Sequence, residues 1–397
     1  MIEKMKTLIV CQHYYPENFV IYKIAEGLLK EGHDITVLTG KPNYGYDDIM
    51  PEYKNVSYEE INGVKVHRVN LHPRGKTKMD KIKNYLSFWK NSKKWVKECK
   101  DQFEAIYTLS LSPVTMISAG NLYKKKHHVK HIVHCVDLWP ESVLVTKAVR
   151  KNSLTYRILY HWSKKIYKCA DEILIGSPTF KEYFEKVLKL PTDNIHYVPQ
   201  PSLVEVNDGL RKPLGPGFHV LYCGNLGLIQ ETNLIPEAMS LVKNDKVVFH
   251  VIGMGPKVEE LKKMVNDLHL RGRVIYHGAL PAKKAAPYFK ACDVSYISLN
   301  PEGYVGKTIP NKLMMSMAFG KPILGVLDGD GKEVIGESKC GYTVPNNPED
   351  IAKTIDKMSR LKEDELKRLG DNAKAYYFDH FSIDKVSKQI STYLKKE

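Results

Sequence analysis

The chain has 397 residues, a length that predicts two domains because domains usually hold about 100 to 200 residues. Hydrophobic residues make up 43% of it, which excludes a disordered or fibrous protein, since enough apolar surface is present to offset chain entropy. The formal net charge of +15 predicts a polyanionic neighbour, and nucleic acid, anionic lipid and phosphorylated ligands all qualify.

The cysteines and the N-terminal segment indicate the expected compartment. Seven cysteines are scattered along the chain without a CxxC pair or zinc-ligand spacing, as is typical of reduced thiols. The N-terminal segment has an apolar run of only four residues, too short for a signal peptide or a spanning helix. We therefore expect a cytoplasmic protein.

The first half of the chain predicts a doubly wound parallel sheet. Residues 7–11 predict a buried strand, followed by a helix from about Ile21 to Glu31, a stop at Gly32 and a second strand at 34–39. Helical segments then alternate with further apolar runs, at 64–69, 105–109, 131–136, 172–177 and 195–199. We assign residues 1–200 to a Rossmann-like N-terminal domain.

The second half predicts a similar domain after a linker. Residues 201–217 are rich in Pro and Gly and have no sustained period. A second α/β pattern fills 218–382, with apolar runs at 219–224, 246–253, 274–280, 294–299 and 322–327. A last helix at about 383–397 could pack back on the first domain. Open parallel sheets bind ligands at the carboxyl ends of their strands, so the pattern favours a nucleotide in a cleft.

Two segments of the second domain predict phosphate binding. Pro310 precedes a helix expected to begin near Asn311, and a helix N-terminus offers free N–H groups and a positive dipole end to a phosphate. Lys312 in the first turn suits a bound anion, with an ordinary surface lysine as the alternative. Gly224 and Gly227 follow a strand and would let backbone approach a pyrophosphate, although a tight strand-to-helix turn explains them equally well.

Eight segments stand in order along nearly the whole chain: YYPEN at 14–18, GHDITVLTGKPNY at 32–44, INGVKVHRV at 61–69, DLWPES at 137–142, CGNLG at 223–227, VIGMGP at 251–256, TIPNK at 308–312 and MAFGKPIL at 317–324. Together they resemble glycosyltransferase family 4, in its bacterial capsule and O-antigen branch. The resemblance implies a GT-B fold, in which two doubly wound Rossmann-like domains face a central cleft. It also implies a nucleotide-sugar donor in the C-terminal domain, with UDP the expected nucleotide, an acceptor on the N-terminal domain, and retention of anomeric configuration.

Several donor-side positions depart from the family pattern. The family's Glu-x7-Glu carboxylates align with Lys307 and Met315, and its two pyrophosphate-clamping cations align with Asn225 and Gln230. The positive charge must then come from Lys312 or Lys307. Glu302 is the nearby carboxylate and a candidate for the donor sugar, with a plain loop residue as the alternative. The resemblance completes the expected donor set with Gly224, Leu226, Gly227, Gly253, His277, Leu280, Thr308 and Asn311.

Acceptor-side candidates lie in two loops of the first domain. His134, Asp137 and Glu141 lie in or beside DLWPES, where they could meet an acceptor hydroxyl, although leaving-group phosphate can itself accept the proton. The alternatives are a helix cap and its partner for Asp137 and Glu141, and a core position for His134. The resemblance adds Trp139 and, in the first loop, Tyr15, Glu17 and Asn18. Glu17 and Asn18 could equally cap the next helix.

The segment DGD at 328–330 resembles the Asp-x-Asp metal motif of the other main glycosyltransferase fold. It lies in a Gly-rich turn, where Asp and Gly serve turn geometry. GT-B chemistry can instead use a helix dipole and a lysine to stabilise the leaving pyrophosphate. We therefore expect no metal, and no cofactor besides the donor substrate.

Positive charge concentrates at residues 74–100, which hold ten Lys or Arg against two acids. A helix from about Met79 would place Trp89 and Trp95 on an apolar arc flanked by lysines, which suits an anionic membrane surface. The lysines are Lys83, Lys90, Lys94 and Lys97, and a second basic run lies at 123–128. The alternative is a helix whose apolar face packs on the sheet. Nucleic acid is disfavoured because no recognised nucleic-acid module is present.

Three functions remain open at this point. The first is a retaining hexosyl- or N-acetylhexosaminyl-transferase that acts on a lipid-linked saccharide at the inner face of the plasma membrane, in surface polysaccharide synthesis. The second is a non-catalytic sugar-nucleotide-binding partner subunit, motivated by the missing carboxylates. The third is a GT-B sugar-nucleotide epimerase, which would act on the donor alone. An NAD-dependent oxidoreductase is disfavoured because the GxGxxG motif is absent.

Overall fold

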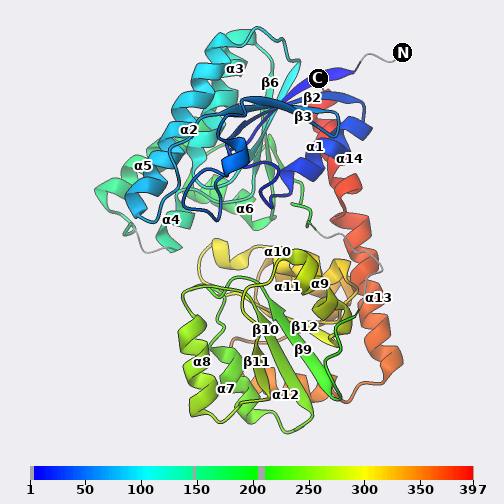
Figure 1. Cartoon of the computed structure of the whole chain (residues 1–397). Helices are drawn as coiled ribbons and strands as arrows, with labels where there is room; N and C mark the ends of the chain where they lie inside the picture. The colour runs from blue at the N-terminus through cyan, green and yellow to red at the C-terminus, as the bar shows by residue number, and fades with distance from the viewer. Residues whose placement is uncertain (1–3, 146–148, 204–210, 397) are drawn as a thin grey trace. The chain divides into compact units, whose positions relative to one another are not determined.

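The computed structural model describes residues 4–145, 149–203 and 211–396. They form two compact units: one runs to Leu203 and resumes at Ser382, and the other ends at Phe381. Each unit is a mainly parallel sheet with helices packed against it (Figure 1). Within these ranges, no helix is both long and apolar enough to cross a bilayer.

The first unit is built on an eight-stranded sheet in the order β3-β4-β2-β1-β5-β6-β7-β8. Its neighbours are parallel except for the antiparallel β3–β4 pair. Leu8 and Val10 pack into one core cluster and Ile9 into another, so β1 is buried on both faces and reads as a continuous apolar run. The strands are β1 (Met5–Val10), β2 (His33–Gly40), β3 (Tyr58–Ile61), β4 (Val64–Val69), β5 (Ala105–Ser110), β6 (Lys130–Cys135), β7 (Glu172–Ile175) and β8 (Ile195–Tyr197).

The helices of the first unit pack against both faces of this sheet. Helices α1 and α14 contact each other, and α2 packs on α3 (Figure 1). The helices are α1 (Ile21–Lys30), α2 (Lys78–Glu98), α3 (Ser118–His127), α4 (Glu141–Val145), α5 (Leu154–Tyr167), α6 (Thr179–Glu182) and α14 (Ile383–Lys395). Shorter helical turns lie at Pro51–Tyr53, Val114–Ile117 and Tyr183–Val187.

Helix α14 is part of the core of the first unit, although it is the last element of the chain. Val386, Ile390 and Leu394 are buried in the same cluster as α1. A Cβ atom at Gly27 would lie 2.1 Å from the Ser387 Oγ atom, so the absence of a side chain there lets the two helices approach closely. The unit is therefore assembled from both ends of the sequence.

The second unit holds a six-stranded, fully parallel sheet in the order β11-β10-β9-β12-β13-β14. This order reverses between β9 and β12, a topology that places ligand sites beyond the carboxyl ends of the strands. The strands are β9 (Phe218–Cys223), β10 (Val247–Ile252), β11 (Val274–Tyr276), β12 (Val294–Ser298), β13 (Ile323–Val326) and β14 (Gly341–Thr343).

Helices also cover this second sheet. Ile235 and Met239 of α7 share a core cluster with Ile355 of α12, whereas Phe289 of α9 packs with Leu221 in another. The helices are α7 (Leu234–Leu241), α8 (Val258–Asp267), α9 (Ala282–Ala291), α10 (Asn311–Ala318), α11 (Asp330–Ser338), α12 (Pro348–Met358) and α13 (Glu363–His380), with a short turn at Val305–Lys307.

Candidate functional site

Two glycine loops interlock at the carboxyl edge of β9 and β10. Gly253 has φ +150°, and a Cβ atom there would lie 1.8 Å from the Gly224 carbonyl oxygen. Gly255 has φ +155°, and its Cβ would lie 2.2 Å from the Leu226 oxygen. The Leu226 amide donates to the Met254 carbonyl at 2.8 Å. At Gly253 and Gly255 a side chain would both clash with the neighbouring loop and strain the backbone. Backbone atoms therefore line this edge.

Helix α10 begins beside these loops. Pro310 is its N-cap residue, with extended backbone and no side-chain cap. Asn311 is exposed and Lys312 half-buried. The first amides of an α-helix have no intrahelical acceptor, so an uncapped N-terminus leaves them for a ligand. The site expected at TIPNK therefore has the right local geometry for an anion.

Lys312 links the helix to the glycine loops. Its Nζ atom donates to the Tyr222 hydroxyl at 2.9 Å and lies 4.7 Å from the centre of that ring. Its Cδ and Cε atoms pass Gly224, where a Cβ would be 2.9 Å away. Burial lowers the pKa of Lys312 to about 7. A bound pyrophosphate would favour the charged ammonium, so this lysine is poised to gain a proton with the ligand.

The uncharged residues at the family's clamp positions gather around Gly227. A Cβ there would lie 2.3 Å from Gln230 Oε1 and 2.7 Å from Asn225 Nδ2. Among the described residues, Gln230 Oε1 is buried without a hydrogen-bond partner. A buried orphan acceptor is costly, so this position suits a ligand that brings an N–H or O–H donor.

The positions that replace the family's carboxylates lie in different environments. Met315 is partly buried and packs against the apolar cluster of α9. Lys307 is exposed in the turn before Thr308, whose hydroxyl donates to the Val305 oxygen at 3.0 Å. Glu302 is exposed, and its amide donates to the Asn300 side-chain oxygen at 2.9 Å. Neither replacement supplies a carboxylate.

Sequence reasoning missed a carboxylate in this region. Glu231 is half-buried with φ +46°, and its side chain accepts a hydrogen bond from the Asn300 amide group. Asn300 also receives the Glu302 amide, so Glu231 lies by the loop that carries Glu302. The available signal was its place in the sequence, within ten residues of the predicted glycine loop. No motif marks Glu231, and its positive φ cannot be read from the sequence.

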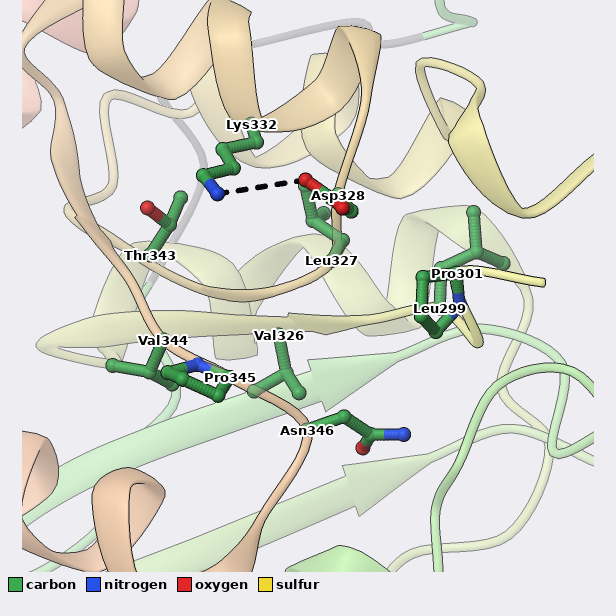
Figure 2. Close-up of a pocket in the computed structure, with 10 residues that line it drawn as sticks. All are labelled: Leu299, Pro301, Val326, Leu327, Asp328, Lys332, Thr343, Val344, Pro345 and Asn346. Carbon is green, nitrogen blue, oxygen red and sulfur yellow. Dashed lines mark hydrogen bonds and ion pairs between the residues drawn. The ribbon is translucent and has the colours of Figure 1, made fainter.

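A cavity of about 290 Å³ opens at the carboxyl ends of β12, β13 and β14 (Figure 2). Leu299, Val326 and Val344 contribute apolar walls, and Lys332 pairs with Asp328 at 3.5 Å on the polar side (Figure 2). Asp330, the second acid of DGD, is buried in the first turn of α11. In the described parts of the chain, no three His, Cys, Asp or Glu side chains gather as metal ligands.

The loop after β11 joins the glycine loops through backbone. The Gly253 amide donates to the Gly278 carbonyl at 2.9 Å. The neighbouring His277 is half-buried, and its Nε2 atom lies 2.9 Å from Nδ1 of His250. Burial lowers the pKa of His277, so this side chain is neutral near pH 7. Leu280 packs partly against the α9 cluster.

In the first unit, the expected role of His134 is wrong. The side chain is fully buried, with Nδ1 at 2.7 Å from the Tyr107 hydroxyl and Nε2 at 2.8 Å from the Val198 carbonyl oxygen. Both ring nitrogens are therefore occupied, and burial lowers its pKa to about 4. His134 is a satisfied core histidine that has no nitrogen left for an acceptor hydroxyl.

The other DLWPES residues divide between surface and core. Asp137 is exposed and accepts a hydrogen bond from the Ser112 backbone. Because α4 begins at Glu141, Asp137 lies outside the cap position and the capping alternative is wrong for it. Glu141 accepts from the Tyr156 hydroxyl at 2.6 Å. Trp139 is buried, which leaves Asp137 as the most accessible of these candidates.

The first loop is held from within by Glu17. Its carboxylate is buried and accepts the amides of Asn43 at 2.7 Å and Tyr44 at 2.6 Å, while His13 Nδ1 lies 3.0 Å away. Helix α1 begins at Ile21 without a side-chain cap, so the capping alternative for Glu17 and Asn18 is wrong. Tyr15 and Asn18 are exposed and stay available to a ligand.

The apolar residues that the sequence places on one arc of helix α2 fall into a buried set and an exposed set. Phe88 and Val96 are buried, whereas Met79, Ile82 and Leu86 are exposed on another side. The expected lysines at 83, 90, 94 and 97 are exposed. Both tryptophans are half-buried: the ring centres of Trp95 and His67 are 5.0 Å apart, and those of Trp89 and Trp162 are 6.0 Å apart.

Helix α5 adds an exposed apolar surface that sequence reasoning missed. Leu154 is 75% exposed and Ile158 is 59% exposed. The Trp89–Trp162 contact joins α5 to α2, so exposed apolar residues occur on two connected helices. Their i, i+4 spacing was the available signal in the sequence.

The chain matches two related family models. One, described as a glycosyl transferase 4-like domain, matches residues 18–201, and the other, glycosyl transferases group 1, matches residues 217–360. The chain is 28% identical over 304 residues to the probable glycosyltransferase WbjE of Pseudomonas aeruginosa, covering 72% of this chain and 74% of that protein. It is 22% identical over 275 residues to the putative colanic acid biosynthesis glycosyltransferase WcaL of Escherichia coli, covering 66% and 63%.

The fold comparison agrees with the sequence models. HepE of Anabaena, solved in complex with UDP and glucose, superposes with a TM-score of 0.71 at 14% identity, covering 98% of this chain and 99% of that one. At this identity the likeness shows the fold, whereas the two family models together span most of both units. The chain therefore belongs to the group 1, family 4 glycosyltransferases and has the GT-B fold.

Proposed function

We propose that the protein transfers a sugar from a UDP-sugar to a lipid-linked saccharide, with retention of configuration, in surface polysaccharide synthesis. The observation that carries the proposal is the anion site of the second unit, where two backbone-lined glycine loops, the uncapped N-terminus of α10 and Lys312 come together. The names of WbjE and WcaL and the UDP complex of HepE support the substrate class.

The donor phosphates would lie over Gly224–Gly227 and the start of α10, with the Lys312 ammonium as the nearest positive charge. The helix dipole and Lys312 would stabilise the charge that develops on the leaving UDP, without a metal ion. Asn225, Gln230, Lys307 and Thr308 are the further donor-side candidates, with His277 and Leu280 toward the base. Asp137, Glu141, Tyr15 and Asn18 are the acceptor-side candidates.

The missing carboxylates favour a second candidate, a non-catalytic sugar-nucleotide-binding subunit. Met315 is part of an apolar cluster and Lys307 is a cation, so neither position supplies the carboxylate that the family pattern places there. Glu231 and Glu302 are the carboxylates in the described loops that could substitute for them in the transferase. Transfer of sugar by the purified protein separates the two candidates.

A lipid-linked acceptor requires the enzyme to work at a membrane, and we propose that residues 74–100 bind the anionic inner face of the plasma membrane from the cytoplasm. The exposed lysines of α2 and the exposed Met79, Ile82 and Leu86 support this assignment. Leu154 and Ile158 of α5 enlarge the apolar part of the surface.

A thermal-shift panel of nucleotides is the first test of the donor site. A ligand that binds the folded state raises the unfolding midpoint, by a free energy that grows with its concentration over Kd. We expect UDP to raise it more than CMP, GDP or ADP at equal concentration. No shift with any nucleotide at millimolar concentration would contradict the proposal.

A further inference from the structure

Three loops meet at the carboxyl edge of the first sheet, where β1, β2 and β4 end. Residues 11–20 follow β1, residues 41–50 follow β2 and residues 70–77 follow β4. The Glu17 carboxylate binds the amides of Asn43 and Tyr44, and the Gly75 amide donates to the Asp47 carbonyl at 2.9 Å. The loops therefore hold one another in place at the edge where open α/β sheets bind ligands.

Two polar groups at this junction lack partners. Asn43 is 0% exposed, and neither its side-chain oxygen nor its nitrogen has a hydrogen-bond partner among the described residues. Nη1 of Arg74 is also buried without a partner in that part of the chain. An unpaired buried amide costs free energy, and an unpaired guanidinium nitrogen costs more because it carries charge. Their presence together indicates a ligand that brings complementary groups.

Two aromatic rings flank the Arg74 guanidinium, whose Nη1 atom is the unpaired nitrogen. The Arg74 Cζ atom lies 4.7 Å from the centre of the Tyr44 ring and 5.4 Å from that of Tyr85, and Nη2 donates to the Tyr85 hydroxyl at 3.2 Å. Tyr44 also packs against Phe19 at 4.9 Å and is 48% exposed. Arginine held by rings presents its remaining N–H groups in fixed directions, which suits phosphate or carboxylate recognition.

The charges around the junction are compatible with an anion. The acidic Glu17 is engaged by two amides and by His13 at 3.0 Å. Asp47, an exposed acid in the loop after β2, pairs with Lys76 at 3.5 Å. Asp80, which lies against Gly75, accepts from the Thr77 hydroxyl at 2.6 Å and lies 3.5 Å from His72. The acids of the junction therefore already have cationic, N–H or O–H partners.

We propose that Asn43, Tyr44 and Arg74 form a recognition site for an anionic saccharide, with its phosphate or carboxylate on Arg74, a hydroxyl on Asn43 and a sugar ring against Tyr44. The site rests on the proposed function, because it assigns the acceptor to a sugar that carries negative charge. It lies in the first unit, and none of its residues belongs to the donor set.

Saturation-transfer NMR on the full chain tests the site with defined probes. The probes are glucose 1-phosphate, glucuronic acid and neutral methyl glucoside, each with excess UDP so that the donor site is filled. We expect signal for the phosphate or the carboxylate sugar, or both, and little for methyl glucoside. A signal for glucose 1-phosphate alone would indicate that the site binds a phosphate next to the lipid. A signal for glucuronic acid alone would indicate that it binds an acidic sugar within the saccharide.

Matched variants separate this site from others. Arg74→Gln should weaken binding of the anionic sugar about ten- to a hundredfold, the usual effect of losing a charge-assisted hydrogen bond. Lys76→Gln, an exposed charge two residues away, should leave it unchanged. Lys312→Met should weaken UDP binding about ten- to a hundredfold but keep the anionic-sugar signal. The proposal would be overturned if Arg74→Gln kept the saturation-transfer signal of the anionic sugar. It would also be overturned if Lys312→Met lost that signal while Arg74→Gln kept it. Neither result would count against the proposed donor site.

Asn43→Leu supplies a readout that does not depend on a ligand. Removing an unpaired buried amide should raise the unfolding midpoint of the free protein by about 2 to 4 °C, while anionic-sugar binding falls. A purely structural asparagine predicts the reverse, a lower midpoint with unchanged binding. If Arg74→Gln fails to fold, this variant and Arg74→Lys, which keeps the charge but not the fork of N–H groups, carry the test. Unchanged binding in both would refute the site.

Discussion

Replacing Lys312 with Met should weaken UDP binding strongly, because the residues at the family's two clamp positions, Asn225 and Gln230, carry no charge. Methionine keeps the length of the stem that passes Gly224 and removes only the ammonium that donates to Tyr222. Loss of a charge-assisted hydrogen bond of about 1.5 to 3 kcal/mol corresponds to about ten- to a hundredfold in affinity.

The lowered pKa of Lys312 gives this prediction a pH signature. In the free protein the pKa is about 7, so at pH 8 about nine in ten molecules hold a neutral lysine. UDP favours the ammonium and raises the pKa, so binding takes up a proton. The contribution of this ammonium to UDP affinity should be constant below pH 7 and fall as pH rises above 7, at up to tenfold per unit, until the pKa of the complex is reached.

Titration calorimetry of UDP in two buffers with different ionisation enthalpies measures this proton uptake directly. Wild type should take up close to one proton at pH 8, whereas Lys312→Met should take up none at pH 8 and show affinity independent of pH from 8 to 9, where the phosphates of UDP are fully ionised. Lys263→Met, at an exposed lysine of α8 in the same unit, is a matched control expected to behave as wild type. Equal UDP affinity in wild type and Lys312→Met would refute the assignment.

Three further predictions follow from other parts of the molecule. Asp137→Asn should lower kcat with little change in UDP affinity, because the carboxylate is exposed in the first unit while the nucleotide belongs to the second; unchanged kcat would remove Asp137 from the acceptor site. Replacing Lys83, Lys90, Lys94 and Lys97 with Gln should abolish co-sedimentation with anionic vesicles, at about 1 kcal/mol per lysine, whereas replacing the exposed Lys263, Lys283, Lys284 and Lys339 should not. If the wild type also pelleted with neutral vesicles, binding would not depend on attraction between these lysines and anionic lipid. Because burial holds His134 neutral with a pKa of about 4, below the ordinary value near 6.5, its contribution to stability is present above pH 6.5 and is lost as pH falls toward 4. His134→Gln should therefore unfold with a weaker dependence on pH over that range, and an identical dependence would show that another group controls acid unfolding.

Much of the fold could be predicted because buried parallel strands give continuous apolar runs. The runs at 7–11 and 131–136 correspond to β1 and β6, whose side chains are buried on both faces. The strands that escaped prediction are half-buried edge strands. β3 (Tyr58–Ile61) alternates exposed and half-buried residues, and β14 (Gly341–Thr343) has only three residues, so neither provides an apolar run.

The local geometry of the candidate donor site could be predicted where backbone forms it. Gly224 and Gly253 mark loop positions that exclude side chains by contact, and Pro310 marks the start of α10. His134 was a candidate because it precedes DLWPES at the predicted edge of the sheet, and its otherwise apolar strand was the ground for the core alternative. Its partners, Tyr107 and the Val198 carbonyl, lie 27 and 64 residues away, and no local pattern reveals them.

Asn43 and Arg74 show the opposite limit. Asn43 lies in the segment at 32–44 and Arg74 begins the basic run at 74–100, but neither pattern links the two residues, whose significance comes from hydrogen bonds that are missing after folding. Likewise, the sequence offered Glu17 as an acceptor contact or a helix cap, whereas its carboxylate accepts hydrogen bonds from amides 26 and 27 residues away. Such long-range satisfaction of polar groups depends on tertiary structure, which composition and periodicity do not encode.

Acceptor-dependent release of UDP is the direct measure of sugar transfer by this protein. Purified wild type is incubated with a panel of UDP-sugars, with and without a bacterial lipid-linked oligosaccharide extract and with EDTA present, and UDP and glycolipid products are measured by mass spectrometry. The account predicts UDP release and a new glycolipid from at least one UDP-sugar, only when acceptor is present, and loss of both in Lys312→Met. Binding of UDP-sugars without transfer to any acceptor, or conversion of the donor to an epimer without acceptor, would contradict it.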